Sequence, residues 1–259
     1  MLRANISIST DGITQPSIKP APPDGGATVK RNNQSFVVTI SANPSARALS
    51  ALVRTLRAVE TKMELHGAGG FNHGHYTRSK LCVLLSQMAL DQRELEIAPQ
   101  FTSKIEILSG ALLDIDVLPE NLFRSGQLSL GTLDVPTALQ RISEVGIENL
   151  VSVGQTMSMK LSFIARPDNL IWPSQTPKLG ETFEECLPRA EGEWLSTVYE
   201  AALAIRQPLY HHGLISIDSK GRQPFQRLIY PLAPAHERSI NHRVLSVATL
   251  NNHPNYQMI

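Results

Sequence analysis

Cysteine, aromatic residues and long apolar runs are all scarce in this sequence. Its 259 residues include two cysteines, Cys82 and Cys186, which lie far apart and form no metal-type spacing, so a reducing compartment is favoured. Aromatic residues make up 5%, which leaves few rings to stack on bases or flavins. No apolar run is long enough to cross a bilayer, and the first residues contain no apolar core of signal-peptide length. We therefore expect a cytoplasmic protein that makes no membrane contact.

An excess of charge of one sign and the motifs of common enzymes are also missing. The net charge is +1, whereas a nucleic-acid-binding domain usually carries a basic surplus. The sequence contains no Gly-x-Ser-x-Gly, His-x-x-x-His or Walker pattern. We therefore expect a non-enzymatic protein without a metal or other cofactor. What the chain does have is 42% hydrophobic residues, enough for one large domain or two small ones.

Composition and periodicity divide the chain into four regions. Residues 1–35 are rich in proline and glycine and are expected to form a disordered tail. Residues 36–146 are expected to be a helical region, residues 147–250 a mixed domain, and residues 251–259 a C-terminal tail. The predicted fold class is thus α+β, with a helical N-terminal region followed by an antiparallel sheet with flanking helices.

An apolar seam marks the first predicted helix, which begins at Asn43-Pro44 with a cap residue and a proline. Its members recur at spacings of three and four residues, as on one face of a helix: Leu49, Leu52, Leu56, Val59 and Met63. Two interpretations stay open, a dimerisation helix or a helix packed on its own domain. A second stripe occurs in the helix predicted to run from Thr77 to about Ile97. With little other core in this region, we predict a homodimer through these helices.

The stretch from Glu193 to Leu250 reads as one helix followed by three strands. Apolar residues at helical spacing continue to Arg206, where Gln207-Pro208 ends the helix. The predicted strands are Leu209–Ile217, Gln226–Tyr230 and Arg243–Leu250, and their short connections favour adjacent antiparallel pairing. In the first of them, His211 and His212 point to opposite faces and cannot bind one ion together.

Two sequence segments in this stretch resemble those of a known domain family. The segments "Ala-Ile-Arg-Gln-Pro-Leu-Tyr" from Ala204 and "Phe-Gln-Arg-Leu-Ile-Tyr-Pro-Leu" from Phe225 resemble the C-terminal half of PAS-like domains of alphaproteobacterial signalling proteins. The resemblance implies a five-stranded antiparallel sheet, which needs two further strands before the helix. The hairpin candidate at 150–164 could supply them, which would give a domain of the usual size. It could instead be the wing of a winged helix-turn-helix.

A second resemblance concerns Val135-Pro-Thr-Ala-Leu-Gln-Arg-Ile, which is similar to the recognition helix of MarR-like winged helix-turn-helix proteins. The segment Phe101–Ile115 is then expected to be the helix packed beneath it. The resemblance implies that Thr137, Gln140 and Arg141 would face bases and phosphates of DNA. The chain is therefore expected to be a signalling or transcriptional regulator with a PAS sensor or dimerisation domain. The alternative is a PAS module that binds another signalling protein and no DNA.

Overall fold

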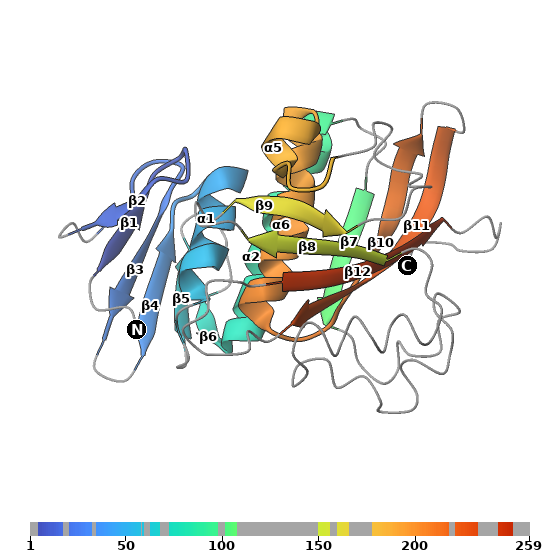
Figure 1. Cartoon of the computed structure of the whole chain (residues 1–259). Coiled ribbons are helices and arrows are strands. Elements are labelled where there is room, and N and C mark those ends of the chain that lie inside the picture. Colours follow the sequence, from blue (N-terminus) through green and yellow to red (C-terminus); the bar gives the residue numbers. More distant parts are fainter. Residues whose placement is uncertain are drawn as a thin grey trace. The chain divides into compact units, whose positions relative to one another are not determined.

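The computed structural model describes residues 5–17, 21–32, 35–57, 59, 63–67, 73–97, 102–107, 150–155, 160–165, 178–217, 221–232 and 243–250. The chain divides into two compact units, Met1–Arg93 and Glu94–Ile259, and each is described by itself below (Figure 1). The described residues form an α+β structure, in agreement with the predicted class.

The first unit contains a mixed six-stranded sheet in the order β2-β1-β3-β4-β5-β6. All neighbours in it are antiparallel except β4 and β5, which are parallel. Parallel neighbours need a crossover, and α1 supplies it. The elements, with their bounds, are β1 (Ile6–Ile8), β2 (Thr14–Pro16), β3 (Ala27–Arg31), β4 (Phe36–Ile40), α1 (Ala46–Leu56), β5 (Met63–Gly67), β6 (Gly74–Tyr76) and α2 (Arg78–Ile97).

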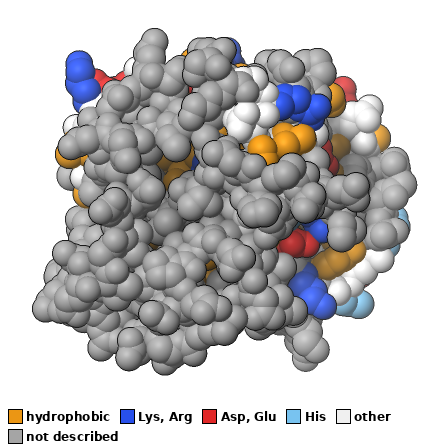
Figure 2. All heavy atoms as spheres, turned by 90° about the vertical axis from the view of Figure 1, so that its right-hand side faces the viewer, with side chains coloured by type: hydrophobic (Ala, Val, Ile, Leu, Met, Phe, Trp, Pro, Cys, Tyr) orange, Lys and Arg blue, Asp and Glu red, His pale blue; other side chains and the backbone are white. Residues whose placement is uncertain are grey.

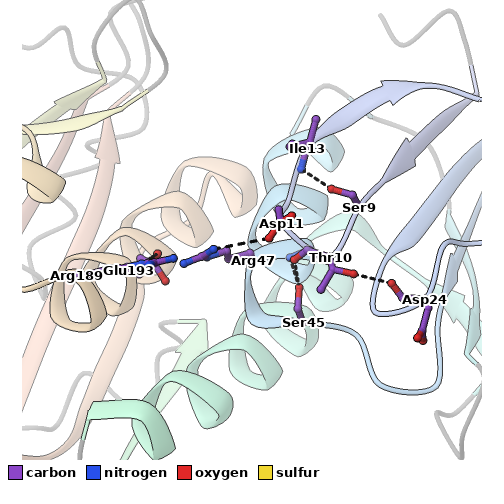
Figure 3. Close-up of polar contacts among 10 residues, drawn as sticks. Ser9, Thr10, Asp11, Ile13, Asp24, Ser45, Arg47, Arg189 and Glu193 are labelled. Atoms are coloured by element: carbon purple, nitrogen blue, oxygen red, sulfur yellow. Dashed lines mark hydrogen bonds and ion pairs between the residues drawn. The ribbon is translucent and has the colours of Figure 1, made fainter.

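The loop between β1 and β2 is fixed on the N-terminus of α1 (Figure 3). Ser45 caps the helix, since its hydroxyl accepts a hydrogen bond from the backbone N–H of Ala48 at 3.0 Å. The same hydroxyl donates to the backbone oxygen of Thr10, whose own hydroxyl donates to the backbone oxygen of Asp24 at 2.6 Å. Two side chains, Ser45 and Thr10, thereby tie the helix start to two loops of the sheet.

The sheet-rich first unit corrects three predictions. Residues 1–35 are not a disordered tail, because β1, β2 and β3 lie there and side chains such as Ile8 and Val29 are fully buried. The region that follows is not wholly helical, because β4, β5 and β6 alternate with its helices. The apolar seam does not run along one helix either: α1 ends at Leu56, and Met63 begins β5. Short strands that pair with distant segments leave little local signal, which explains the errors.

The second unit contains a six-stranded sheet in the order β7-β10-β11-β12-β8-β9, with every neighbouring pair antiparallel. Figure 1 shows α6 lying along this sheet, with α5 at the N-terminal end of the helix. The elements are β7 (Thr102–Ile107), β8 (Leu150–Gln155), β9 (Leu161–Ala165), α5 (Phe183–Cys186), α6 (Arg189–Ile205), β10 (Leu209–Ile217), β11 (Gly221–Leu232) and β12 (Arg243–Leu250).

The predicted arrangement of the last three strands and of the helix before them is confirmed. The three strands after α6 are adjacent and antiparallel, and the helix packs on one face of their sheet. The hairpin at 150–165 belongs to the same sheet, because β8 pairs with β12 from Val247 opposite Leu150 to Arg243 opposite Gly154. The sheet has six strands where five were expected, since Thr102–Ile107 is a strand and not part of a helix.

β7 joins the sheet beside β10 at a position where only glycine fits. A Cβ atom on Gly213 would lie 2.0 Å from the backbone oxygen of Thr102 and 2.6 Å from the Cα atom of Ser103. Both obstacles are backbone, so they cannot rotate away as the end of a flexible side chain could. Gly213, two residues after His211, therefore allows β7 to approach β10 closely.

Candidate functional site

Strands β10 and β11 place a histidine and an arginine side by side under α6. His211 and Arg227 are direct partners in the antiparallel register, so their side chains lie on the same face of the sheet. Phe225, two residues before Arg227, shares this face. His211 is fully buried and Arg227 is 6% exposed. The sheet face that meets the helix thus carries two polar groups where apolar residues would be usual.

Helix α6 brings two aromatic rings to this pair. The guanidinium carbon of Arg227 lies 5.8 Å from the ring centroid of Trp194, 5.9 Å from that of Tyr199 and 5.7 Å from that of Phe225. The His211 ring lies 5.1 Å from Trp194 and 5.0 Å from Phe225, between ring centroids. We call these five residues the Arg227 site: His211, Arg227, Trp194, Tyr199 and Phe225.

Hydrogen bonds from outside the site hold the Trp194 ring in place. Its indole Nε1 donates to the Oε1 atom of Glu94 at 3.2 Å, and the hydroxyl of Ser103 donates to the same oxygen. Trp194 is fully buried, and an indole N–H in such a position needs an acceptor. Glu94 therefore fixes the orientation of the Trp194 ring, which faces Arg227 and His211.

The charge of Arg227 has no counter-charge among the described residues. Burial lowers the pKa of its guanidinium, and the Tyr199 side chain raises it; no described carboxylate acts on it. Its Nη1 atom is buried and has no hydrogen-bond partner in the described part of the chain. A guanidinium nevertheless stays protonated in proteins. A cation–π contact contributes roughly 0.5–2 kcal/mol, whereas burying an ion costs several kcal/mol, so the rings alone do not compensate for this charge.

The His211 imidazole is neutral and also lacks a hydrogen-bond partner. Burial first, and then the charge of Arg227 and His212, hold its pKa well below its ordinary value. Within the described residues, neither Nδ1 nor Nε2 has a partner. A neutral imidazole carries one N–H donor and one acceptor. The site therefore presents an unused imidazole donor next to the unused Nη1 atom of Arg227.

His212 lies on the other face, as the alternation along the strand predicted. Its ring stacks on Tyr210 at 4.6 Å between centroids, and its Nε2 atom lies 3.6 Å from the Oε2 atom of Glu106. Burial lowers the pKa of His212, and the Glu106 carboxylate opposes this shift. The two neighbouring histidines thus belong to separate environments.

Comparisons with protein-family models, with curated proteins and with solved structures found no match for this chain. What the chain does must therefore be argued from the site itself. No cluster of three or more potential metal ligands occurs within the described ranges. None of the described helices is long and apolar enough to cross a membrane.

The residues predicted from sequence lie elsewhere. Thr137, Gln140 and Arg141, the predicted DNA contacts, fall in 108–149, outside the described residues, so DNA binding stays a prediction. The five residues of the predicted dimer seam are at most 1% exposed in a single chain, which favours the interpretation of a packed helix over that of a dimerisation helix: Leu49, Leu52, Leu56, Val59 and Met63. The homodimer stays a prediction, but these five buried residues no longer support it.

Sequence reasoning missed the Arg227 site. One signal could have indicated it: Phe225, Arg227 and Ile229 alternate along one strand, so the arginine shares the apolar face of its neighbours. On the face of the molecule in Figure 2, the visible side chains of described residues are basic, acidic, histidine and apolar in mixture, without a large gathering of one kind.

Proposed function

We propose that this chain is a non-enzymatic regulatory protein whose second unit is a PAS-type sensory domain. The observation that carries the proposal is the order of its strands together with the placement of α6. The hairpin β8–β9 precedes the helices and the strands β10, β11 and β12 follow them, yet β8 pairs with β12, the last strand. The order β9-β8-β12-β11-β10 matches the order expected of a PAS sheet, which supports the proposal, and β7 would then be an addition at its edge.

The packing between helix and sheet supports a sensory role. PAS-like domains bind ligands, where they do so, between the sheet and the helices on one face. Here that interface holds buried groups with unused hydrogen-bonding capacity, Arg227 and His211. Buried polar groups are usually satisfied within the protein or by something bound. A signal molecule that binds there would contact α6 and the central strands at once and could alter their packing.

Two narrower versions of the function differ in what the regulator acts on. The chain could act on DNA through Thr137, Gln140 and Arg141, or on another signalling protein without DNA contact. A mobility-shift assay across a salt series separates the two versions. Phosphate contacts make DNA affinity fall steeply with salt, and Arg141→Ala would reduce that slope.

The sensory role is tested by a thermal-shift screen of the full chain against neutral, cationic and anionic small molecules. A ligand at a hundred times its Kd stabilises the folded state by about 2.7 kcal/mol, which corresponds to a rise in Tm of roughly 5–10 °C. We expect at least one saturable binder, and hydrogen exchange should slow in α6, β10 and β11 but not in α1. A screen in which no class binds would contradict the sensory role and leave protein binding as the function of the unit.

A further inference from the structure

We propose that the Arg227 site binds the carboxylate of a small organic acid with a single negative charge and an apolar body. The inference rests on the proposed sensory function and adds the chemical class of the ligand. Arg227 would hold the carboxylate, His211 would donate one hydrogen bond, and the rings of Trp194, Tyr199 and Phe225 would contact the apolar part.

The charge of the site selects the charge of the ligand. The buried cation within the site is Arg227, and burial keeps His211 neutral. A monoanion would therefore pair with the one charge that the five residues of the site carry, whereas the Glu94 carboxylate outside these five accepts hydrogen bonds from Trp194 and Ser103. A dianion such as phosphate or succinate would leave one buried negative charge without a partner, which is strongly unfavourable. A neutral ligand would leave the guanidinium as it is, and a cation would add repulsion.

The shape of the donors selects a carboxylate. A guanidinium presents parallel N–H groups that match the two oxygens of a carboxylate, and such bidentate pairs are among the strongest hydrogen bonds in proteins. The Nη1 atom of Arg227 is available for this contact within the described part of the structure. The imidazole of His211 is its direct neighbour across the strands and offers the remaining donor.

The surroundings of the pair select an apolar body. Three aromatic rings lie within 6 Å of the guanidinium carbon, on α6 and on β11. Apolar buried side chains lie next to them on the helix-facing side, among them Ile105 of β7, Leu209 of β10 and Ile229 of β11. The polar neighbours Ser103 and Glu94 are hydrogen-bonded to each other, and Glu94 also accepts from Trp194. An acid with several hydroxyl groups would lose hydrogen bonds with water there and gain none.

The test is titration calorimetry of the full, extensively dialysed chain with matched acid and amide probes. Sodium phenylacetate and sodium butyrate should bind with saturation, whereas phenylacetamide, which has nearly the same shape and no charge, should bind at least 10-fold more weakly. Inorganic phosphate and succinate should bind more weakly than phenylacetate. Equal affinity for phenylacetate and its amide would overturn the proposal without requiring any variant to fold.

Variants then assign the effect to Arg227. Arg227→Gln should weaken phenylacetate binding by about 10- to 100-fold, the usual range for a lost charged hydrogen bond, and leave amide binding little changed. Arg222→Gln is the matched control, because Arg222 is exposed on the same strand, and it should bind like the wild type. A loss of the same size in both variants, or none in Arg227→Gln, would overturn the assignment.

The outcomes separate this inference from the sensory role. If only neutral or cationic molecules bind and slow exchange in α6, the second unit is a sensor and the acid proposal fails. If wild type binds no carboxylate, the site is not a ligand site for acids and the proposal is wrong. Saturable binding of phenylacetate that depends on Arg227 supports both proposals.

Discussion

At the scale of single residues, the buried histidine makes stability depend on pH. The pKa of His211 is well below its ordinary value when the chain is folded, whereas the unfolded chain has the ordinary value of about 6.5. Below that pH the unfolded state takes up a proton that the folded state does not. Stability should therefore fall as pH falls from 6.5, by up to about 1.4 kcal/mol per pH unit from this group.

The prediction is checked by urea unfolding at pH 7.5 and at pH 5.5. Wild type should lose more stability between the two pH values than His211→Gln, because glutamine has no such proton to bind. His75→Gln, at an exposed position in β6, should lose as much as wild type. His212 also has a lowered pKa, but it is present in all three proteins and does not affect the comparison. An equal loss in His211→Gln and wild type would contradict the buried neutral state.

Single residues also show why the site was hard to predict from sequence. Alternation along a strand was sufficient to place His211 and His212 on opposite faces. The same alternation puts Arg227 on the face of Phe225 and Ile229, but a charged residue in a strand is usually on the exposed face. Trp194 and Tyr199 come from α6, and Glu94, which accepts the hydrogen bond of Trp194 from outside the site, lies 100 residues before it in the sequence. No local sequence pattern indicates that these residues are in contact in the folded chain.

At the scale of elements, predictions succeeded where the pattern is local and failed where the pairing is distant. Helix α6 and the strands β10–β12 have clear apolar periodicity and short connections, so their order and pairing could be predicted. In contrast, β1 and β3 are separated by a proline-rich segment, and tertiary pairing overrides the weak local preference. The apolar residues from Leu49 to Met63 have a helical spacing only by coincidence, because this segment includes the end of α1 and the start of β5.

Helix α1 permits a test of capping with an internal control. Ser45→Ala removes the cap hydrogen bond to Ala48 and the bond to the Thr10 loop (Figure 3), and should destabilise the first unit by about 1 kcal/mol. Ser50 lies inside the same helix, and its hydroxyl donates to the backbone oxygen of Ala46 at 2.9 Å. Ser50→Ala should cost little, because alanine favours the helix interior. Urea unfolding of both variants measures the difference, and equal costs would contradict the capping role.

At the scale of the whole molecule, the apolar seam has a different role from the one its spacing suggested. A dimer seam must be exposed in the free chain, and leucines on it would be covered only by the partner. Leu52 and Leu56 are fully buried within a single chain, and α1 packs against β1 and β3 of the same unit. Burial of this kind is expected of a core, and it requires no second chain.

The double variant Leu52→Glu, Leu56→Glu distinguishes a core from a dimer seam. Two carboxylates placed in a core cost several kcal/mol, a large part of the 5–15 kcal/mol that stabilises a typical domain. We therefore expect loss of circular dichroism from the first unit and rapid proteolysis. The control carries the same two charges at exposed leucines of α2, Leu84 and Leu95, which are 36% and 78% exposed, and should stay folded. Analytical ultracentrifugation decides the remaining case: a double variant that is fully folded and half the mass of wild type would show that Leu52 and Leu56 form a dimer interface after all.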